Sequence, residues 1–112
     1  MGLAEQTCIP CKGGVPPLAG PERERLLAQL NEGGGEWSVI DGHHLRRVYL
    51  FDDFVTALAL VNRIGALAEE QGHHPDLELS WGKVGVEIWT HKIGGLTESD
   101  FVLAAKIEQL QR

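Results

Sequence analysis

The sequence has little positive charge and lacks any long apolar run. It contains 10 Lys and Arg residues against 16 Asp and Glu residues, a formal net charge of −6 at pH 7. Proteins that bind nucleic acid use Lys and Arg to displace counterions from phosphates, so we expect no direct nucleic-acid partner. A membrane-spanning helix needs ~20 apolar residues, and a secretory signal needs a basic segment before an apolar one. Neither pattern is visible, and we expect a cytoplasmic protein without membrane contact.

Cysteine is also scarce. The two cysteines, Cys8 and Cys11, are expected to be reduced in the cytoplasm. Their Cys-x-x-Cys spacing supplies half of a four-ligand zinc site, but the sequence has no second pair. No helical pattern follows them directly, as a thioredoxin-like redox site would require. We favour a non-catalytic role and keep shared metal binding or redox sensitivity as the alternative.

The length and composition indicate one domain. A chain of 112 residues, 43% of them hydrophobic, is large enough to bury one core without disulfides or metals. Glycines and prolines interrupt any regular period in residues 1–20, which we expect to form a loosely structured N-terminal segment. Residues 21–112 then form the single domain.

Local signals divide this domain into helices and strands. The predicted helices run from Pro21 to the glycines at 33–35, from Asp52 or Asp53 to about Gln71, and onward from a capping box at Thr97–Asp100. Apolar alternation between them predicts two β-hairpins, with turns at Asp41-Gly42 and near Trp81-Gly82-Lys83. The apolar positions assigned to the four strands are Trp37 and Val39; Leu45, Val48 and Leu50; Leu77, Leu79 and Trp81; and Val84, Val86 and Ile88.

The element order is therefore α-β-β-α-β-β-α. Two hairpins separated by a helix predict an α+β fold, in which a four-stranded, mostly antiparallel sheet carries three helices on one face. The other face must be covered or solvated. Open sheet edges in so small a chain can pair with another subunit, so we expect a homo-oligomer.

Three histidines lie at the ends of predicted elements. His73 and His74 follow the second helix, and His91 follows the last strand. Because an imidazole can accept or donate a proton at neutral pH, the trio suits acid–base chemistry. In the alternatives, the adjacent pair only binds the last carbonyls of the helix, or the histidines hold zinc, although neighbouring side chains at a helix end rarely point at one ion. His43 and His44 are expected to be exposed residues near the first turn.

Three other polar or aromatic residues have structural explanations of their own. Asp100 occupies the third position of the capping box, which accounts for it without a substrate. Glu69 can be an ordinary solvated helix residue. Trp81 can be a core residue or a stacking platform. Motifs of phosphate-binding loops and nucleophile elbows are absent from the sequence.

These residues together resemble the active-site signature of the pterin-4a-carbinolamine dehydratases. The matching positions are Glu69, His73-His74-Pro75, Trp81, His91 and Asp100. The segment from Thr90 to Thr97, THKIGGLT, is similar to the family's T-H-x-x-G-G-L-T segment. Cys8 with the GGVPPL stretch at 13–18, and Trp37 before the first hairpin, resemble the bacterial members. The resemblance covers essentially the whole chain, and the family's α+β fold agrees with the element order.

The resemblance implies a hydro-lyase reaction. In this reaction 4a-hydroxytetrahydrobiopterin, a pterin-4a-carbinolamine, loses water and gives quinonoid dihydrobiopterin. Recycling of this kind restores the tetrahydrobiopterin used by aromatic amino-acid hydroxylases such as phenylalanine hydroxylase, to which a functional link is implied. No cofactor and no metal are expected, because the pterin is the substrate and imidazoles can move both protons.

Roles for the site residues follow from the same resemblance. It implies that His73, His74 and His91 are catalytic; we assign the first and last as the acid–base pair and expect His74 to orient the pterin. The implied substrate-binding residues are Glu69, Trp81 and Asp100. The two carboxylates would hold the imidazoles or bind the pterin edge, and the indole would wall the pocket.

The resemblance also implies partners. A homodimer or homotetramer is expected. Members of the family can act as dimerisation partners of transcription factors, and related domains can serve as assembly chaperones for Rubisco in carboxysomes. A non-enzymatic protein-binding module is therefore the alternative to the dehydratase.

Overall fold

The computed structural model describes residues 2–6 and 16–111. Its elements are a short 3₁₀ helix η1 (Leu3–Glu5), α1 (Gly20–Asn31), β1 (Ser38–Ile40), β2 (His44–Leu50), α2 (Phe54–Gln71), β3 (Asp76–Ser80), β4 (Lys83–Ile88) and α3 (Glu98–Gln109). The predicted α-β-β-α-β-β-α order is confirmed. In these two ranges no helix has both the length and the apolar character needed to cross a membrane.

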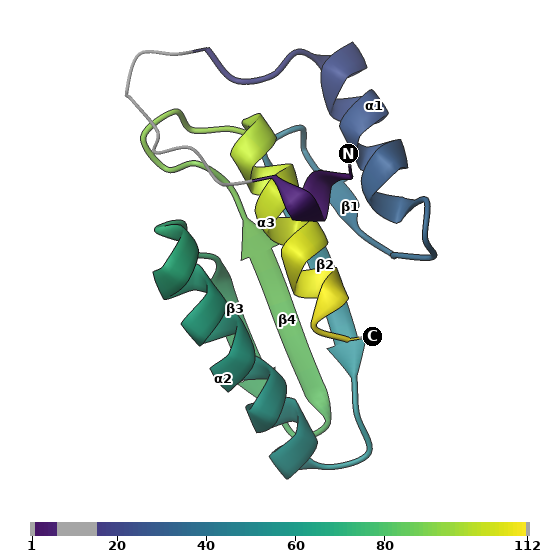
Figure 1. The fold of residues 1–112 in the computed structure, drawn as a ribbon, viewed down its shortest axis with the longest axis vertical. Helices are drawn as coiled ribbons and strands as arrows, with labels where there is room; N and C mark the ends of the chain where they lie inside the picture. Colours follow the sequence, from purple (N-terminus) through teal and green to yellow (C-terminus); the bar gives the residue numbers. More distant parts are fainter. Residues whose placement is uncertain (1, 7–15, 112) are drawn as a thin grey trace.

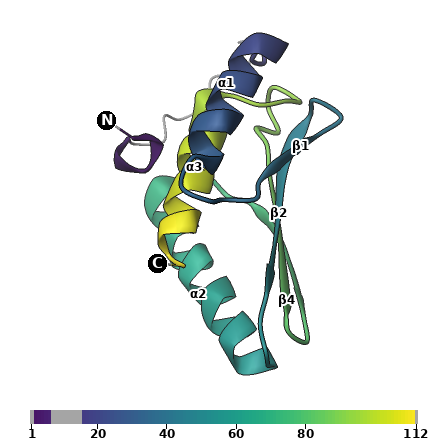
Figure 2. The ribbon, with the colours of Figure 1, turned by 90° about the vertical axis from the view of Figure 1, so that its right-hand side faces the viewer.

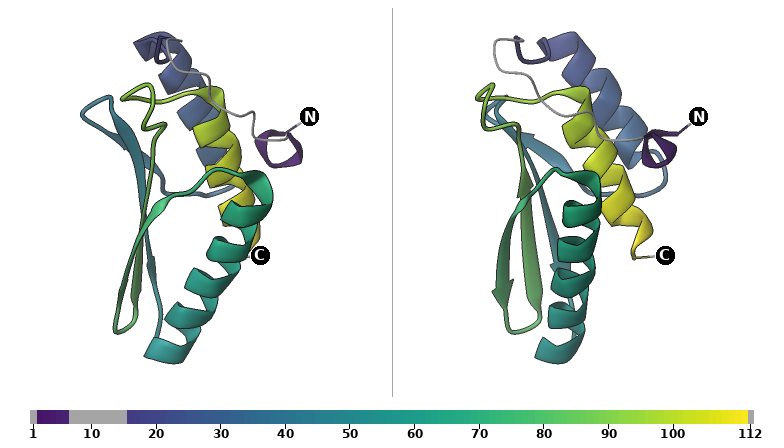
Figure 3. Two further views of the ribbon diagram at one scale, coloured as in Figure 1. Left: turned by 90° about the vertical axis from the view of Figure 1, so that its left-hand side faces the viewer. Right: turned by 60° about the vertical axis from the view of Figure 1, so that its left-hand side comes forward.

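The strands form one sheet with three helices on a single face. The order across the sheet is β1-β2-β4-β3, and each neighbouring pair is antiparallel. Figure 1 shows α2 in front of β3 and α3 in front of β2. Seen edge-on, α1, α2 and α3 all lie on one side of the sheet (Figures 2 and 3). The predicted α+β fold class is confirmed.

Local sequence signals explain where the two helices nearest the site begin and end. The Asp53 carboxylate caps α2 by accepting a hydrogen bond of 2.9 Å from the backbone N–H of Thr56. Gly72 ends α2 with a φ of +65°, a left-handed conformation that favours glycine. At the start of α3, Thr97 and Asp100 form the predicted capping box.

The core lies between the sheet and the helices. Val84, Val86 and Ile88 of β4 are fully buried, as are Phe101 and Leu103 of α3. The other face of the sheet carries charged side chains. Arg46 pairs with Glu87 at 2.9 Å and lies 3.8 Å from Glu78. This face is therefore solvated rather than apolar.

The apolar alternation assigned to β2 was wrong in part. The strand turns Leu45 and Tyr49 toward the helices, and Arg47 lies between them on the same face. Leu50, assigned as an apolar strand position, is 77% exposed. A charged residue can occupy the inner face here because Glu108 of α3 neutralises its guanidinium at 3.1 Å. The partner lies 61 residues away, so the sequence pattern alone did not reveal it.

Glu108 is the centre of a cluster that joins α3 to the sheet. Its Oε1 atom accepts hydrogen bonds from Trp37 Nε1 at 3.0 Å, Arg47 Nε at 3.1 Å and the Tyr49 hydroxyl at 2.5 Å. The guanidinium of Arg47 also lies 4.2 Å from the centre of the Tyr49 ring. Burial, and then the Glu108 carboxylate, raise the pKa of Tyr49 far above its ordinary value. These four residues are called the Glu108 cluster below.

The N-terminal segment contributes to the core at one point. Leu3 of η1 is buried, and Lys106 Nζ of α3 donates a hydrogen bond of 2.8 Å to the carbonyl of Ala4. Cys8 and Cys11, and the glycines of the GGVPPL stretch, lie outside the described residues.

Candidate active site

The fold brings the three predicted catalytic histidines into one pocket. The left-handed turn at Gly72 directs the chain from α2 toward β3, and His73 and His74 lie in the short segment between the two elements. The antiparallel pairing of β3 with β4 returns the chain to the same end of the sheet, where His91 follows. The resulting pocket has a volume of about 420 Å³. It is lined by Gly72, His73, His74, Pro75, Asp76, Trp89, Thr90, His91 and Lys92.

His73 is held from behind by a buried carboxylate. Its Nε2 lies 2.6 Å from Oδ1 of Asp100, a side chain with no solvent exposure. A carboxylate accepts hydrogen bonds, so this contact assigns the Nε2 proton to the ring and leaves Nδ1 as the nitrogen that can take up a proton. The pairing is the arrangement by which a carboxylate fixes the tautomer and orientation of a working histidine.

The second oxygen of Asp100 is bound to the backbone and side chains around it. Oδ2 accepts hydrogen bonds of 2.8 Å from both Thr90 Oγ1 and the Thr97 backbone N–H. Asp100 therefore caps α3 and holds His73 with the same carboxyl group. Because the group is fully buried behind the imidazole, this geometry favours holding the histidine over binding a ligand directly.

His74 has a different carboxylate partner, on the solvent side. Its Nε2 pairs with Oε2 of Glu69, in the last turn of α2. The side chains of His74 and Glu69 are 60% and 79% exposed, so this pair is far more hydrated than the pair between His73 and Asp100. The two adjacent histidines are thus oriented separately.

His91 packs against an aromatic ring. The centroid of its imidazole lies 4.3 Å from that of Trp89, with the two rings at 80°. The sequence analysis gave this tryptophan no role. The signal was present, however, since residues two apart along an extended chain point to the same side.

Trp81 is not brought to this pocket. It lies in the turn between β3 and β4, and its side chain is 73% exposed. The five residues of β3, at ~3.3 Å each, carry the turn roughly 16 Å from the histidine end of the hairpin. The wall predicted for Trp81 is therefore formed within this chain by Trp89.

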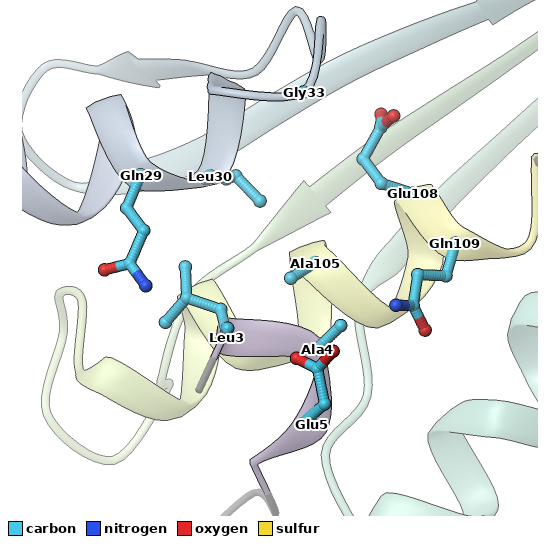
Figure 4. Close-up of a pocket in the computed structure, with 10 residues that line it drawn as sticks. Leu3, Ala4, Glu5, Gln29, Leu30, Gly33, Ala105, Glu108 and Gln109 are labelled. Carbon is cyan, nitrogen blue, oxygen red and sulfur yellow. The ribbon is translucent and has the colours of Figure 1, made fainter.

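A second hollow has no comparable chemistry. It has a volume of about 140 Å³ and lies between η1, α1 and α3, with Leu3, Leu30 and Ala105 among its lining residues (Figure 4). It contains no histidine. Within residues 2–6 and 16–111, no group of three or more His, Cys, Asp or Glu side chains is arranged to hold a metal ion.

Comparisons with known proteins show the family of the chain. The sequence model of the family described as pterin 4 alpha carbinolamine dehydratase matches residues 16–110. A protein of Rubrobacter xylanophilus, provisionally named a pterin-4-alpha-carbinolamine dehydratase, is 58% identical over 108 residues, covering 96% of this chain and 97% of that protein.

Two solved structures are also similar. A crystal structure described as a transcriptional coactivator/pterin dehydratase from Brucella melitensis has a TM-score of 0.75 and 30% identity, covering 84% of this chain and 97% of the other. A pterin dehydratase-like protein identified as a RuBisCO assembly factor in the alpha-carboxysome has a TM-score of 0.56 and 19% identity, covering 68% and 87%, and shows the fold alone. With the family match over most of its length and these relatives, the chain belongs to the pterin-4a-carbinolamine dehydratase family.

Proposed function

We propose that this protein is a 4a-hydroxytetrahydrobiopterin dehydratase that works by histidine acid–base catalysis. The observation that carries the proposal is the convergence of three histidines on one pocket, one of them fixed by a buried carboxylate. The names of the relatives support the pterin substrate.

The reaction requires two proton movements. The hydroxyl on C4a leaves as water after an acid protonates it, and the N5–H of the pterin gives its proton to a base as the C4a=N5 bond forms. The proton gained by the base balances the one lost by the acid, so neither a metal nor a cofactor is needed. General acid–base catalysis of this kind contributes ~10²–10⁴-fold.

We assign His73 and His91 as the acid–base pair. Both line the pocket, at the same end of the hairpin: His73 precedes β3 and His91 follows β4. The contact of Nε2 with Asp100 directs the reactive Nδ1 of His73 away from the core. His74, paired to an exposed carboxylate, is assigned to orient the pterin. The product, quinonoid dihydropterin, then enters tetrahydrobiopterin recycling, with a functional link to phenylalanine hydroxylase.

The decisive experiment is a dehydration assay with synthetic 4a-hydroxytetrahydrobiopterin. The purified protein is expected to accelerate the loss of water above the spontaneous rate, and the double variant His73→Ala, His91→Ala to lose most of that acceleration, on the order of 10²-fold or more. Circular dichroism spectra would show that the variant is folded.

A variant that keeps the buried contact provides the control. His73→Gln retains an N–H that can donate to Asp100, so the helix cap is preserved while the imidazole is removed. We expect this variant to be inactive and stable. Wild-type protein that does not exceed the spontaneous rate would overturn the proposed function, and full activity in the double variant would overturn the mechanism.

A protein-binding role is the second candidate. The similar structure from Brucella melitensis is described as both a coactivator and a dehydratase, so the two functions are not exclusive. The double histidine variant also separates them: a binding function is expected to survive it, whereas dehydration is not.

We further propose that the chain forms a homo-oligomer. Among residues 2–6 and 16–111, five large apolar side chains are exposed, namely Leu50, Phe54, Val55, Leu58 and Trp81. A hydrogen bond of 2.8 Å from Phe51 N to Gly82 O joins the segment before α2 to the turn between β3 and β4, so these side chains gather at one end of the molecule. This surface, the apolar end, together with the open edge of β3, supports a second copy of the chain as its occupant.

Charge placed on the apolar end is expected to separate the subunits. Light scattering coupled to size exclusion should show a dimer or tetramer for wild type and a monomer for Val55→Asp, Leu58→Asp, because burying a carboxylate at an apolar contact is unfavourable. Ala28→Asp, on the exposed side of α1, is the matched control and should keep the wild-type mass. A wild-type monomer would contradict the proposal.

A further inference from the structure

Trp89 lines the pocket and packs against three histidine rings. It follows β4, lies opposite the start of β2 and is half-buried. Its ring centroid is 5.3 Å from that of His43, 5.8 Å from that of His44 and 4.3 Å from that of His91. The indole therefore lies between the first hairpin and the candidate active site.

The side of the indole facing the first hairpin is packed by a bonded histidine pair. His43 Nδ1 and His44 Nδ1 are 3.1 Å apart, so one ring donates a hydrogen bond to the other. His44 Nε2 also lies 3.5 Å from Glu87, a residue that Arg46 binds at 2.9 Å. These contacts restrict the histidine rings, and the rings in turn restrict Trp89.

His91 differs from the other two histidines of the pocket in its support. His73 is bound by Asp100 and His74 by Glu69. Within the part of the chain that the structure describes, the side chain of His91 has no carboxylate partner and packs against Trp89. Edge-to-face packing of two rings fixes their mutual angle through the quadrupole of the aromatic face.

We propose that Trp89 is the positioning residue for His91, supplying by ring packing the orientation that carboxylates supply to His73 and His74. The proposal rests on the proposed function for its kinetic consequence, although the contact itself can be measured without any substrate. Misplacing a catalytic group by ~1 Å can cost up to ~10²-fold in rate. Loss of the indole should therefore lower kcat more than it raises KM, since it disturbs a reacting group rather than a binding contact.

Two variants test this inference by NMR and kinetics together. In wild type, the ring current of Trp89 should displace the imidazole proton signals of His91, which are assigned by their disappearance in His91→Gln. In Trp89→Leu these signals should move to the values of an unpacked imidazole, and kcat should fall by about tenfold with KM within about twofold. Trp89→Phe keeps an aromatic ring and should restore most of kcat and part of the displacement.

The control removes an aromatic ring elsewhere. Phe51 packs against the core at the other end of β2, so Phe51→Leu should leave the His91 signals and the kcat-to-KM pattern of wild type unchanged. Unmoved His91 signals in Trp89→Leu would overturn the inference, as would a Trp89→Phe variant no better than Trp89→Leu. A wild-type protein without dehydratase activity would instead overturn the proposed function, and the NMR comparison would still decide whether Trp89 holds His91.

Discussion

Asp100→Asn is expected to lower kcat by on the order of 10²-fold or more while leaving the protein folded. The carboxamide can still accept hydrogen bonds from Thr97 N and Thr90 Oγ1 with its oxygen, so the cap of α3 is kept. Its NH₂ group then faces His73 and donates where the carboxylate accepted. His73 must expose a lone pair at Nε2, which moves its proton to Nδ1 and removes the base from the pocket.

The matched variant Asp100→Ala should fail in a different way. It removes the cap of α3 and takes a hydrogen-bond acceptor from the buried hydroxyl of Thr90. The free energy of unfolding should therefore fall by roughly 2–4 kcal/mol. Urea denaturation followed by circular dichroism would measure this loss, and the dehydration assay would measure kcat. A kcat of Asp100→Asn close to that of wild type would contradict the role assigned to the carboxylate. Equal losses of stability in Asp100→Asn and Asp100→Ala would contradict it as well.

Glu69→Gln is the comparison for the loss of kcat expected in Asp100→Asn. The pair between Glu69 and His74 is exposed, and exposed ion pairs contribute ~0–1 kcal/mol. Its loss should therefore cost less than tenfold in kcat. The difference between the two losses of kcat would show how much more a buried carboxylate partner contributes to a histidine than an exposed one.

Glu108→Ala is expected to cause the largest loss of stability, roughly 3–5 kcal/mol. The substitution leaves the Arg47 guanidinium, the Tyr49 hydroxyl and the Trp37 indole N–H without their shared acceptor in a mostly buried place. Small domains have unfolding free energies of ~5–15 kcal/mol, so a loss of this size is a large fraction of the total stability. Chemical denaturation would measure the loss in the free energy of unfolding. Glu24→Ala, at an exposed position of α1, is the control. A loss below about 1 kcal/mol in Glu108→Ala would show that the Glu108 cluster contributes little.

The pH dependence of the same cluster can be followed through Tyr49, the only tyrosine in the chain. Its pKa is raised in the folded protein, first by burial and then by Glu108, whereas an unfolded tyrosine has a pKa near ~10. Below that pH both states hold the proton, and stability is unaffected. Above it the unfolded chain loses the proton first, so the free energy of unfolding should fall by about 1.4 kcal/mol per pH unit.

Tyrosinate absorbance gives a direct test of this linkage. In wild type it should appear only as the protein unfolds at alkaline pH, in step with the loss of helical circular dichroism. Tyr49→Phe should remove the alkaline slope that this residue contributes. Tyrosinate formation near pH 10 in folded protein would contradict a buried, carboxylate-bound hydroxyl.

Local signals in the sequence were sufficient to predict the elements and the ends of the helices near the site. Asp53, Gly72 and the capping box each act within four residues of the helix end that they define, so no distant information is needed. The histidines could be placed in one pocket because an antiparallel hairpin returns the chain to its starting end. The family resemblance supplied the reaction, which the elements alone could not.

What the sequence did not reveal depends on distances through space. Trp81 matched a position of the family signature, yet the length of β3 carries it away from the histidines, and Trp89 takes the place by the pocket. Arg47 breaks the apolar alternation of β2 because its acceptor is Glu108 on the last helix. For Arg47 the deciding partner lies 61 residues away, where pattern and spacing carry no information.

The double use of one carboxylate at position 100 has an evolutionary consequence. A substitution there changes the helix cap and the orientation of His73 in one step, so natural selection cannot adjust thermal robustness and turnover separately at this site. A lineage that abandoned the reaction would still be held to a capping side chain by the fold. We therefore expect a descendant that has lost catalysis to change at the histidines before it changes at this aspartate.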